Sequence, residues 1–179
     1  LPSRLAASIV ERGLEASVTI HQLALADASG TSTFVIATDA PAYSGLLERV
    51  YDVPTGTQKI EVTLAKLDEV FSGEDRLDYM KIDAEGAEWS ILKGARKVLD
   101  RYRPVVSFEF GEASYRNYGV VPEEVHDYFS SLGYQVFDIR GRELDREAFS
   151  TSSVRQEVWD YIALGRERSS DELLVPLRR

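Results

Sequence analysis

The chain contains no cysteine. This absence excludes a disulfide scaffold, a thiolate zinc site, an iron–sulfur cluster and a cysteine nucleophile. It also fits a reducing compartment, and we expect a cytoplasmic protein. Long hydrophobic runs are missing too, because the apolar stretches are only a few residues long. A membrane-spanning helix needs ~20 such residues, so we expect no membrane segment in this sequence.

Positive charge is scarce: 21 Lys and Arg stand against 30 Asp and Glu, which gives a formal net charge of −9. Such an acidic chain has no general electrostatic attraction to nucleic acids or anionic membrane surfaces, and we expect neither as a partner. Apolar residues make up 44 % of the 179 residues and charged residues 28 %, which is an ordinary globular composition. The length predicts one domain that buries a core without disulfide or metal support.

The N-terminal third of the sequence predicts one helix and three strands. Apolar residues at helical spacing predict a helix that begins near Ser3 and ends at Gly13. The segment 38–56 holds two prolines and two glycines, so we expect a loop with one helical turn. The expected strands are 18–25, 33–37 and 59–63.

The remainder of the sequence predicts strands that alternate with helices. The expected elements are a buried strand at 77–83, a helix through 91–99, a strand at 104–110, a helix from Pro122 to Gly133, and an antiparallel strand pair at 134–139 and 157–164. In the helix through 91–99, the last turns are expected to carry Lys93, Arg96 and Lys97, which complement the helix dipole. The alternation predicts an α/β fold with a mostly parallel sheet over residues 1–165, followed by a polar tail at 166–179.

Acidic residues stand at the ends of two predicted strands. Asp83 ends the 77–83 strand, and Glu109 lies near the end of the next. Ligands of open α/β sheets bind outside the carboxyl ends of the strands, so we expect a site there. The stretch KIDAEGAE at 81–88 crosses from strand to helix through a glycine and adds Glu85. The residue types alone leave two alternatives, a working site or acids that complement a helix N-terminus for about 0.3–1 kcal/mol each.

The same stretch, continued by ILKGA at 91–95, resembles the signature of the FkbM-like methyltransferases, which use S-adenosylmethionine. Further segments within residues 1–164 resemble other elements of the family and occur in the family's order. They are LP at the start of the chain, LALAD with Gly30 at 23–30, VTL and LD within 62–68, and PVV with Glu109 at 104–109.

The resemblance implies a class I methyltransferase fold, a Rossmann-like, doubly wound sheet that is mostly parallel and has a late antiparallel pair. It also implies O-methylation of a hydroxyl on a sugar, glycan or natural-product small molecule, with S-adenosylmethionine as cofactor. Leu25, Ala26 and Asp27 would lie near the adenine, and Asp83 and Glu85 near the sulfonium and the acceptor hydroxyl. For a base that accepts the hydroxyl proton, Asp83 is the first choice and Glu85 the second, with Glu109 as a further catalytic candidate.

Some family elements are absent from the sequence. No G-x-G loop occurs in it, and the first two strands of the family's sheet have no counterpart. We therefore expect the C-terminal part of a longer methyltransferase, with a sheet that breaks between the strands at 18–25 and 77–83. The alternative is a degenerate methyltransferase fold that binds without catalysis. Asp83, Glu85 and Glu109 offer oxygen atoms of the type that divalent cations prefer, but their spacing predicts no closed shell, and we expect no metal.

Several other residues have ordinary interpretations. His21 is expected on the surface of a sheet, and His126 on the exposed face of a helix. Trp89 is interpreted as a packing residue, with the border of an acceptor pocket as its alternative, and Tyr115 and Tyr118 are further candidates for that border. Acceptor specificity is expected to depend on the loops at 38–56 and 111–121.

Overall fold

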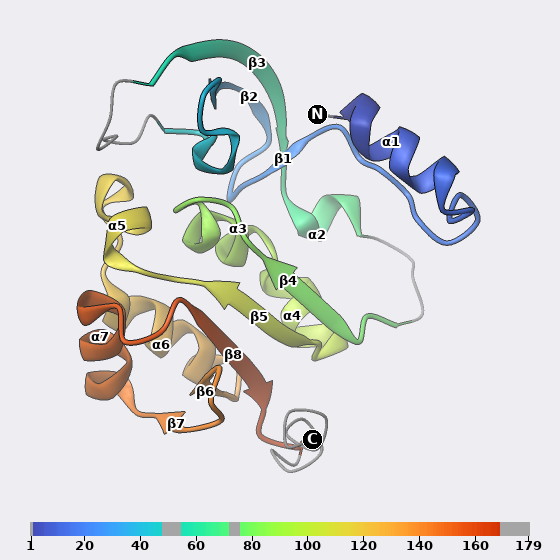
Figure 1. Ribbon diagram of the computed structural model, residues 1–179. Coiled ribbons are helices and arrows are strands. Elements are labelled where there is room, and N and C mark those ends of the chain that lie inside the picture. The colour runs from blue at the N-terminus through green and yellow to red at the C-terminus, as the bar shows by residue number, and fades with distance from the viewer. Residues whose placement is uncertain (1, 48–54, 72–75, 169–179) are drawn as a thin grey trace.

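The computed structural model describes residues 2–47, 55–71 and 76–168 (Figure 1). They form two separate sheets, with strand orders β1-β3-β2 and β4-β5-β8-β6-β7. Only the pairs β1–β3 and β4–β5 are parallel. The fold is therefore mixed α/β, and the expectation of a mostly parallel sheet is wrong. The reason is that β8 lies between β5 and β6 and runs antiparallel to both.

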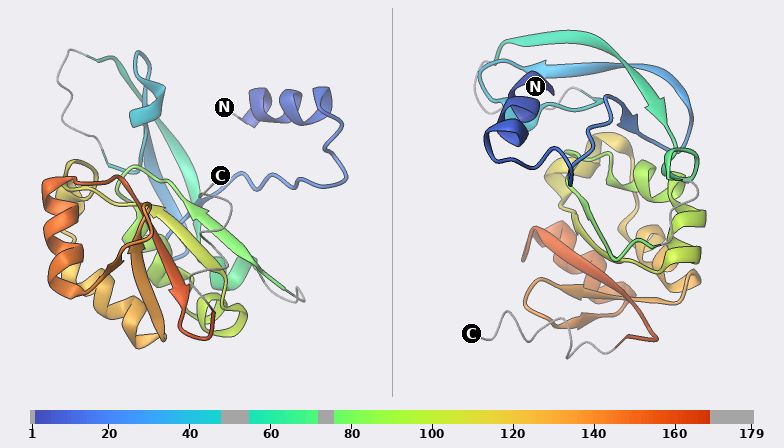
Figure 2. Two further views of the ribbon diagram at one scale, coloured as in Figure 1. Left: turned by 60° about the horizontal axis from the view of Figure 1, so that its bottom comes forward. Right: turned by 90° about the vertical axis from the view of Figure 1, so that its right-hand side faces the viewer.

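The first sheet belongs to what we call the N-terminal unit, the described residues from 2 to 71. Its elements are α1 (Pro2–Glu11), β1 (Ala24–Leu25), β2 (Gly30–Ala37), η1 (Pro41–Tyr43), β3 (Thr57–Ala65) and α2 (Leu67–Val70). Strands β2 and β3 form a long antiparallel ribbon above the second sheet, and α1 stands apart from both sheets (Figures 1 and 2). The expected helix, which ends before Gly13, is confirmed.

The strand expected at 18–25 is wrong over most of its length, because only Ala24 and Leu25 pair with β3. Residues 18–23 have no neighbouring strand among the described residues, so their backbone forms no ladder. By contrast, β2 and β3 extend beyond their expected ends, since eight residues of each pair in continuous register. Of the loop expected at 38–56, the helical turn is present as η1, and residues 48–54 lie outside the described residues.

The second sheet belongs to the C-terminal unit, residues 76–168. Its elements are β4 (Tyr79–Ile82), α3 (Glu88–Gly94), α4 (Arg96–Tyr102), β5 (Val105–Glu109), α5 (Glu112–Tyr115), η2 (Arg116–Tyr118), α6 (Pro122–Ser131), β6 (Tyr134–Asp138), β7 (Glu143–Leu144), α7 (Arg146–Arg155) and β8 (Asp160–Gly165). The predicted strand at 104–110, the helix that begins at Pro122 and the late antiparallel pair are confirmed. Helix α7 was not predicted, although Asp145 marks its start by accepting a hydrogen bond from the Ala148 amide at 2.8 Å.

The helix expected through 91–99 is two helices, which meet at Ala95. The side chain of Asp68 caps the second helix: its carboxylate accepts hydrogen bonds from the Lys97 and Val98 amides at 3.1 and 2.9 Å. Arg96 and Lys97 thus begin α4, and their expected place in the last turns of a helix is wrong. The Arg96 guanidinium lies 5.6 Å from the centre of the Tyr128 ring.

The core of the C-terminal unit lies between the five-stranded sheet and helices α3, α4, α6 and α7. Large aromatic side chains from sheet and helices fill it, and Phe108, Phe129 and Phe149 are fully buried there. A smaller cluster on the opposite face consists only of strand residues, so the described helices pack on one face of this sheet. His126 packs 6.2 Å from Phe149 with a 15 % exposed side chain, and its expected surface position is wrong because α7 covers it.

Strand β4 forms one edge of the second sheet, while β1 forms one edge of the first. The break predicted between these two segments is therefore confirmed. The expectation that the 77–83 strand is buried is wrong, since Ile82 is its only buried residue and Tyr79 is 55 % exposed. The physical reason is that β4 pairs only with β5. Within the described residues, no helix is long and apolar enough to cross a membrane.

Candidate active site

Three predicted site residues, Asp83, Glu85 and Glu109, meet at the carboxyl ends of β4 and β5. One carboxylate oxygen of each lies within 4.8 Å of those of the other two. The parallel pairing of β4 with β5 sets this geometry, because it aligns Ile82 with Phe108 and so places the next residue of each strand side by side. The structure thus brings Glu109 together with Asp83 and Glu85, which lie more than twenty residues earlier in the sequence. Their mutual repulsion is the main electrostatic feature of the site.

Glu109 is half-buried in this cluster. Burial, followed by the negative charges of Asp83 and Glu85, raises the pKa of Glu109 to about 7. A carboxyl group with such a pKa exists as both acid and base near neutral pH, so it can accept or release a proton there.

Asp83 is held differently. Lys81, two residues earlier in β4, extends from the same side of the strand, and its Nζ lies 2.5 Å from Asp83 Oδ2. The pair is about half-exposed, and the hydrogen bond to Asp83 raises the pKa of Lys81. The Lys81 ammonium therefore compensates part of the negative charge of the cluster.

A tight turn leads from β4 into α3 and carries Glu85. Its backbone is left-handed at Glu85, with φ 52°, and Gly86 follows with φ 105°. A Cβ atom at Gly86 would overlap the Ser114 carbonyl and the Tyr118 ring. The glycine in the signature is therefore needed for two reasons, its positive φ and the close approach of the segment 114–118.

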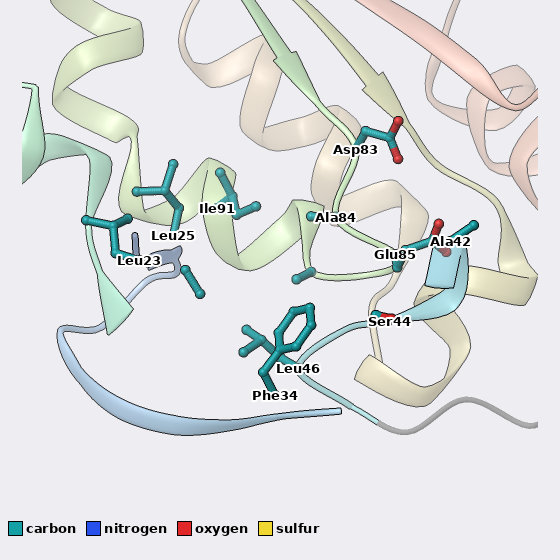
Figure 3. A pocket seen from close by; sticks show the side chains of 12 residues that line it. Leu23, Leu25, Phe34, Ala42, Ser44, Leu46, Asp83, Ala84, Glu85 and Ile91 are labelled. Carbon is teal, nitrogen blue, oxygen red and sulfur yellow. The ribbon is translucent and has the colours of Figure 1, made fainter. Parts of the chain in front are cut away.

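A cavity of about 480 Å³ lies between the N-terminal unit and this turn. Asp83 and Glu85 lie toward one end of it and Leu23 and Leu25 toward the other, with Phe34 among the apolar side chains between them (Figure 3). Asp83 and Glu85 are the two charged residues of its lining. Apolar walls with a few polar groups at one end are typical of small-molecule sites.

The predicted cofactor residues separate in the structure. Leu25 lines the cavity together with Asp83, whereas Ala26 and Asp27 are not part of the lining. Ala26 is buried. The Asp27 carboxylate accepts a hydrogen bond from Ser90 at 2.9 Å and pairs with Lys93 at 2.5 Å, and this pairing lowers the pKa of Asp27.

The second half of the signature therefore joins the two units. Ser90 and Lys93 bind Asp27, and Gly94 approaches the backbone so closely that a Cβ there would overlap the Ala26 carbonyl. The sequence stretch that forms the carboxylate site thus also fastens β1 to α3.

Tyr118, a candidate for the border of an acceptor pocket, lies against the turn that carries Glu85 and is not part of the cavity lining. Its hydroxyl accepts a hydrogen bond from the Leu47 amide at 3.1 Å, and its ring packs on Gly86. It therefore connects the two loops expected to set acceptor specificity, at 38–56 and 111–121. The sequence carries no signal that distinguishes Tyr118, at the end of η2, from Tyr115, which is buried in the core.

The lining indicates which groups the cavity can hold. Its acidic end suits a cation, and its apolar walls suit a flat or aliphatic group. The sulfonium and the adenine of S-adenosylmethionine have these properties, so the described residues fit that part of the cofactor. The three carboxylates also gather oxygen atoms at one point, within 4.8 Å of one another.

The fold and site define an α/β protein with an acidic crevice at the carboxyl ends of its strands. The family model described as the methyltransferase FkbM domain matches residues 9–136, and the chain therefore belongs to this family. The family is described as one of methyltransferases.

Among solved structures, the chain is similar to the methyltransferase FkbM from Methylobacillus flagellatus KT, with a TM-score of 0.48 and 14 % sequence identity. The alignment covers 90 % of this chain and 32 % of that one, so the chain spans about a third of the length of that protein. No curated protein matches the sequence.

Proposed function

We propose that the chain is part of an S-adenosylmethionine-dependent O-methyltransferase and carries the residues that act on the acceptor hydroxyl. The acceptor in this proposal is a hydroxyl of a sugar, glycan or natural-product small molecule. One observation carries the proposal: Asp83 and Glu85, on the signature turn of a methyltransferase family, form the acidic end of a largely apolar cavity, and the Glu109 carboxylate lies within 4.8 Å of both. No nucleic acid or membrane is part of it, because the chain is strongly acidic.

The cofactor would supply an electrophilic methyl group on a sulfonium cation. The carboxylates of Asp83 and Glu85 would hold positive charge at their end of the cavity, where apolar walls reduce screening by water. Leu25 and Ile91 would contact the apolar part of the bound molecule. Holding donor and acceptor in one cavity provides the alignment that an in-line transfer needs.

Glu109 is the residue that we assign as the base. An acceptor hydroxyl must lose its proton during transfer, and a carboxylate with a pKa of about 7 accepts that proton near neutral pH. Such catalysis contributes about 10²–10⁴-fold. Asp83, which the sequence suggested first for this task, is already paired with Lys81 and in this proposal orients the hydroxyl.

Two measurements on the full-length protein test the proposal. Calorimetric titration with S-adenosylhomocysteine is expected to show saturable binding, and methyl transfer to a panel of hydroxyl compounds is expected to show turnover. Glu109→Gln and Asp83→Asn should lower turnover far more than they weaken binding. The matched control is Asp78→Asn. Asp78 lies just before the first residue of β4, at the end away from the site, and pairs with Arg76.

Different failures have different meanings. Absence of saturable binding contradicts the proposal and favours a degenerate fold that binds other partners. Binding with full turnover in Glu109→Gln overturns only the assignment of the base.

A further inference from the structure

Glu88 is a buried acid beside the site that the proposed chemistry does not use. It is the first residue of α3, and its side chain is among the largest that are fully buried, with 1 % of the residue exposed. Oε1 accepts a hydrogen bond from the Ala84 amide at 2.7 Å, while Oε2 is buried without a partner among the described residues. Burial raises the pKa of Glu88. An acid in such a position is costly, so it calls for a functional explanation.

The segment that Glu88 holds is the turn that carries the carboxylates. Ala84 follows Asp83 directly and precedes Glu85, whose left-handed backbone is unusual for a residue with a Cβ. Such a conformation persists only where the surroundings fix it. The bond from Ala84 to Glu88 fixes the turn at its first residue, and the close approach of Ser114 and Tyr118 restricts it at Gly86.

Glu88 does not act at the site directly. It lies outside the cluster of three carboxylates and outside the lining of the cavity. Apart from the electrostatic effect of its charge on Glu109, its influence on the reacting groups must therefore pass through the backbone of the turn.

We propose that Glu88 is the positioning residue of the carboxylate site, which sets where Asp83 and Glu85 stand relative to Glu109 by binding the Ala84 amide. The role in catalysis rests on the function proposed above, whereas the effect on geometry does not. The hydrogen bond needs an acceptor oxygen at this place and does not need a negative charge. Glu88→Gln should therefore keep the geometry of the turn, whereas Glu88→Leu, with a side chain of similar size, should not.

The first experiment follows the titration of the Glu109 carboxyl by NMR in the full-length protein, in Glu88→Gln and Glu88→Leu. The charged groups that act on this carboxyl are Lys81 from β4, Asp83 and Glu85 from the segment after β4, and Glu88 from α3. Asp160 of β8 faces the same site, since it is opposite Glu109 in the strand register and acts on Lys81. Both variants remove the charge of Glu88, and only leucine also removes the acceptor. We expect the pKa of Glu109 to fall further toward the ordinary glutamate range in Glu88→Leu than in Glu88→Gln, because the relaxed turn carries Asp83 and Glu85 away.

A control separates positioning from general loss of stability. Leu144→Ala opens a space in β7, at the opposite edge of the sheet from β4, where the residue is 2 % exposed. It should lower the melting temperature and leave the pKa of Glu109 unchanged. Equal pKa values in the two Glu88 variants, or an equal change in Leu144→Ala, would overturn the proposal.

The second experiment measures turnover and the affinity for S-adenosylhomocysteine in the same proteins. We expect Glu88→Leu to lose about 10- to 100-fold in turnover and Glu88→Gln to recover most of it. If the NMR result holds but neither the wild type nor any variant binds S-adenosylhomocysteine, the proposed function fails and the positioning role stands. If the wild type is active and the two Glu88 variants are equally active, the positioning role fails alone.

Discussion

Strand β5 of the C-terminal unit is buried over its first four residues, whereas β3, the longest strand of the N-terminal unit, contains no buried residue. The difference follows from what covers each sheet. Helices α3 to α7 supply core side chains to the second sheet, while α1 stands apart from the first and exposes Leu5 and Val10. One unit therefore has its own core, whereas the described part of the other contributes no buried residue to either core cluster.

Three of the contacts between the units are polar. Asp27 binds Ser90 and Lys93, Asp68 caps α4, and the Leu47 amide binds Tyr118. Contacts of this kind contribute about 0.5–1.5 kcal/mol each, far less than a buried aromatic core. We infer that the N-terminal unit opens at a lower free energy than the C-terminal unit, and the predictions below test this difference.

The largest effect is expected from Phe149→Ala. Phe149 is fully buried in α7 and contacts the rings of Phe108, Phe110 and Tyr161. Its removal should lower the free energy of unfolding by about 3–5 kcal/mol, as measured by urea denaturation. Val154→Ala is the control, since Val154 lies on the same helix and is 47 % exposed. A loss below that of the control would show that the aromatic cluster is not the source of stability.

Gly94→Ala should have the next largest effect, and it should act between the units. A Cβ at Gly94 would overlap the Ala26 carbonyl, which belongs to backbone and cannot turn away. We expect a loss of about 1–3 kcal/mol together with faster amide exchange in β1 and β3. In the control Gly165→Ala the new Cβ meets only the flexible Glu167 side chain. Unchanged exchange in the N-terminal strands would contradict the proposed attachment.

Asp68→Ala should lower the free energy of unfolding by about 1 kcal/mol, because the Lys97 and Val98 amides lose their cap. Asp68→Asn retains an acceptor oxygen and should lose less. Thermal unfolding of both variants beside the wild type gives the comparison. If alanine and asparagine are equivalent, the cap does not stabilise the junction of α2 with α4.

Glu109→Gln differs from the other variants, because its effect on stability depends on pH. The pKa of Glu109 is raised from 4.5 to about 7, so the folded protein keeps a proton that the unfolded chain has released. The contribution of this group to stability therefore falls as pH rises from 4.5 to about 7. Relative to the wild type, the glutamine variant should gain stability above pH 7 and not below pH 4.5.

Urea denaturation at the two pH values checks this prediction, with the exposed Glu124→Gln as control. The same difference from the wild type at both pH values would show that Glu109 titrates normally.

The sequence predicted most elements of the C-terminal unit, because apolar residues at regular spacing and stops such as Gly133 act locally. It also placed Asp83, Glu85 and Glu109 as acids of one site, since strand ends in an α/β fold meet at one edge. It failed where the partner of a segment decides the outcome. Residues 18–23 have strand composition without a strand beside them, and the end of α3 depends on Asp68 from a distant helix.

Trp89 lies where the two units can be observed separately. Its ring is 5.7 Å from the Lys93 ammonium and 5.2 Å from the Tyr128 ring, and the same ammonium binds Asp27 of the N-terminal unit. Release of Asp27 would free Lys93 and change the electric field at the indole. The second tryptophan, Trp159, is 48 % exposed beside Gly111 after the carboxyl end of β5, and its emission is a reference within the same molecule. The protein thus contains an intrinsic fluorophore that reports attachment of its N-terminal unit without any label.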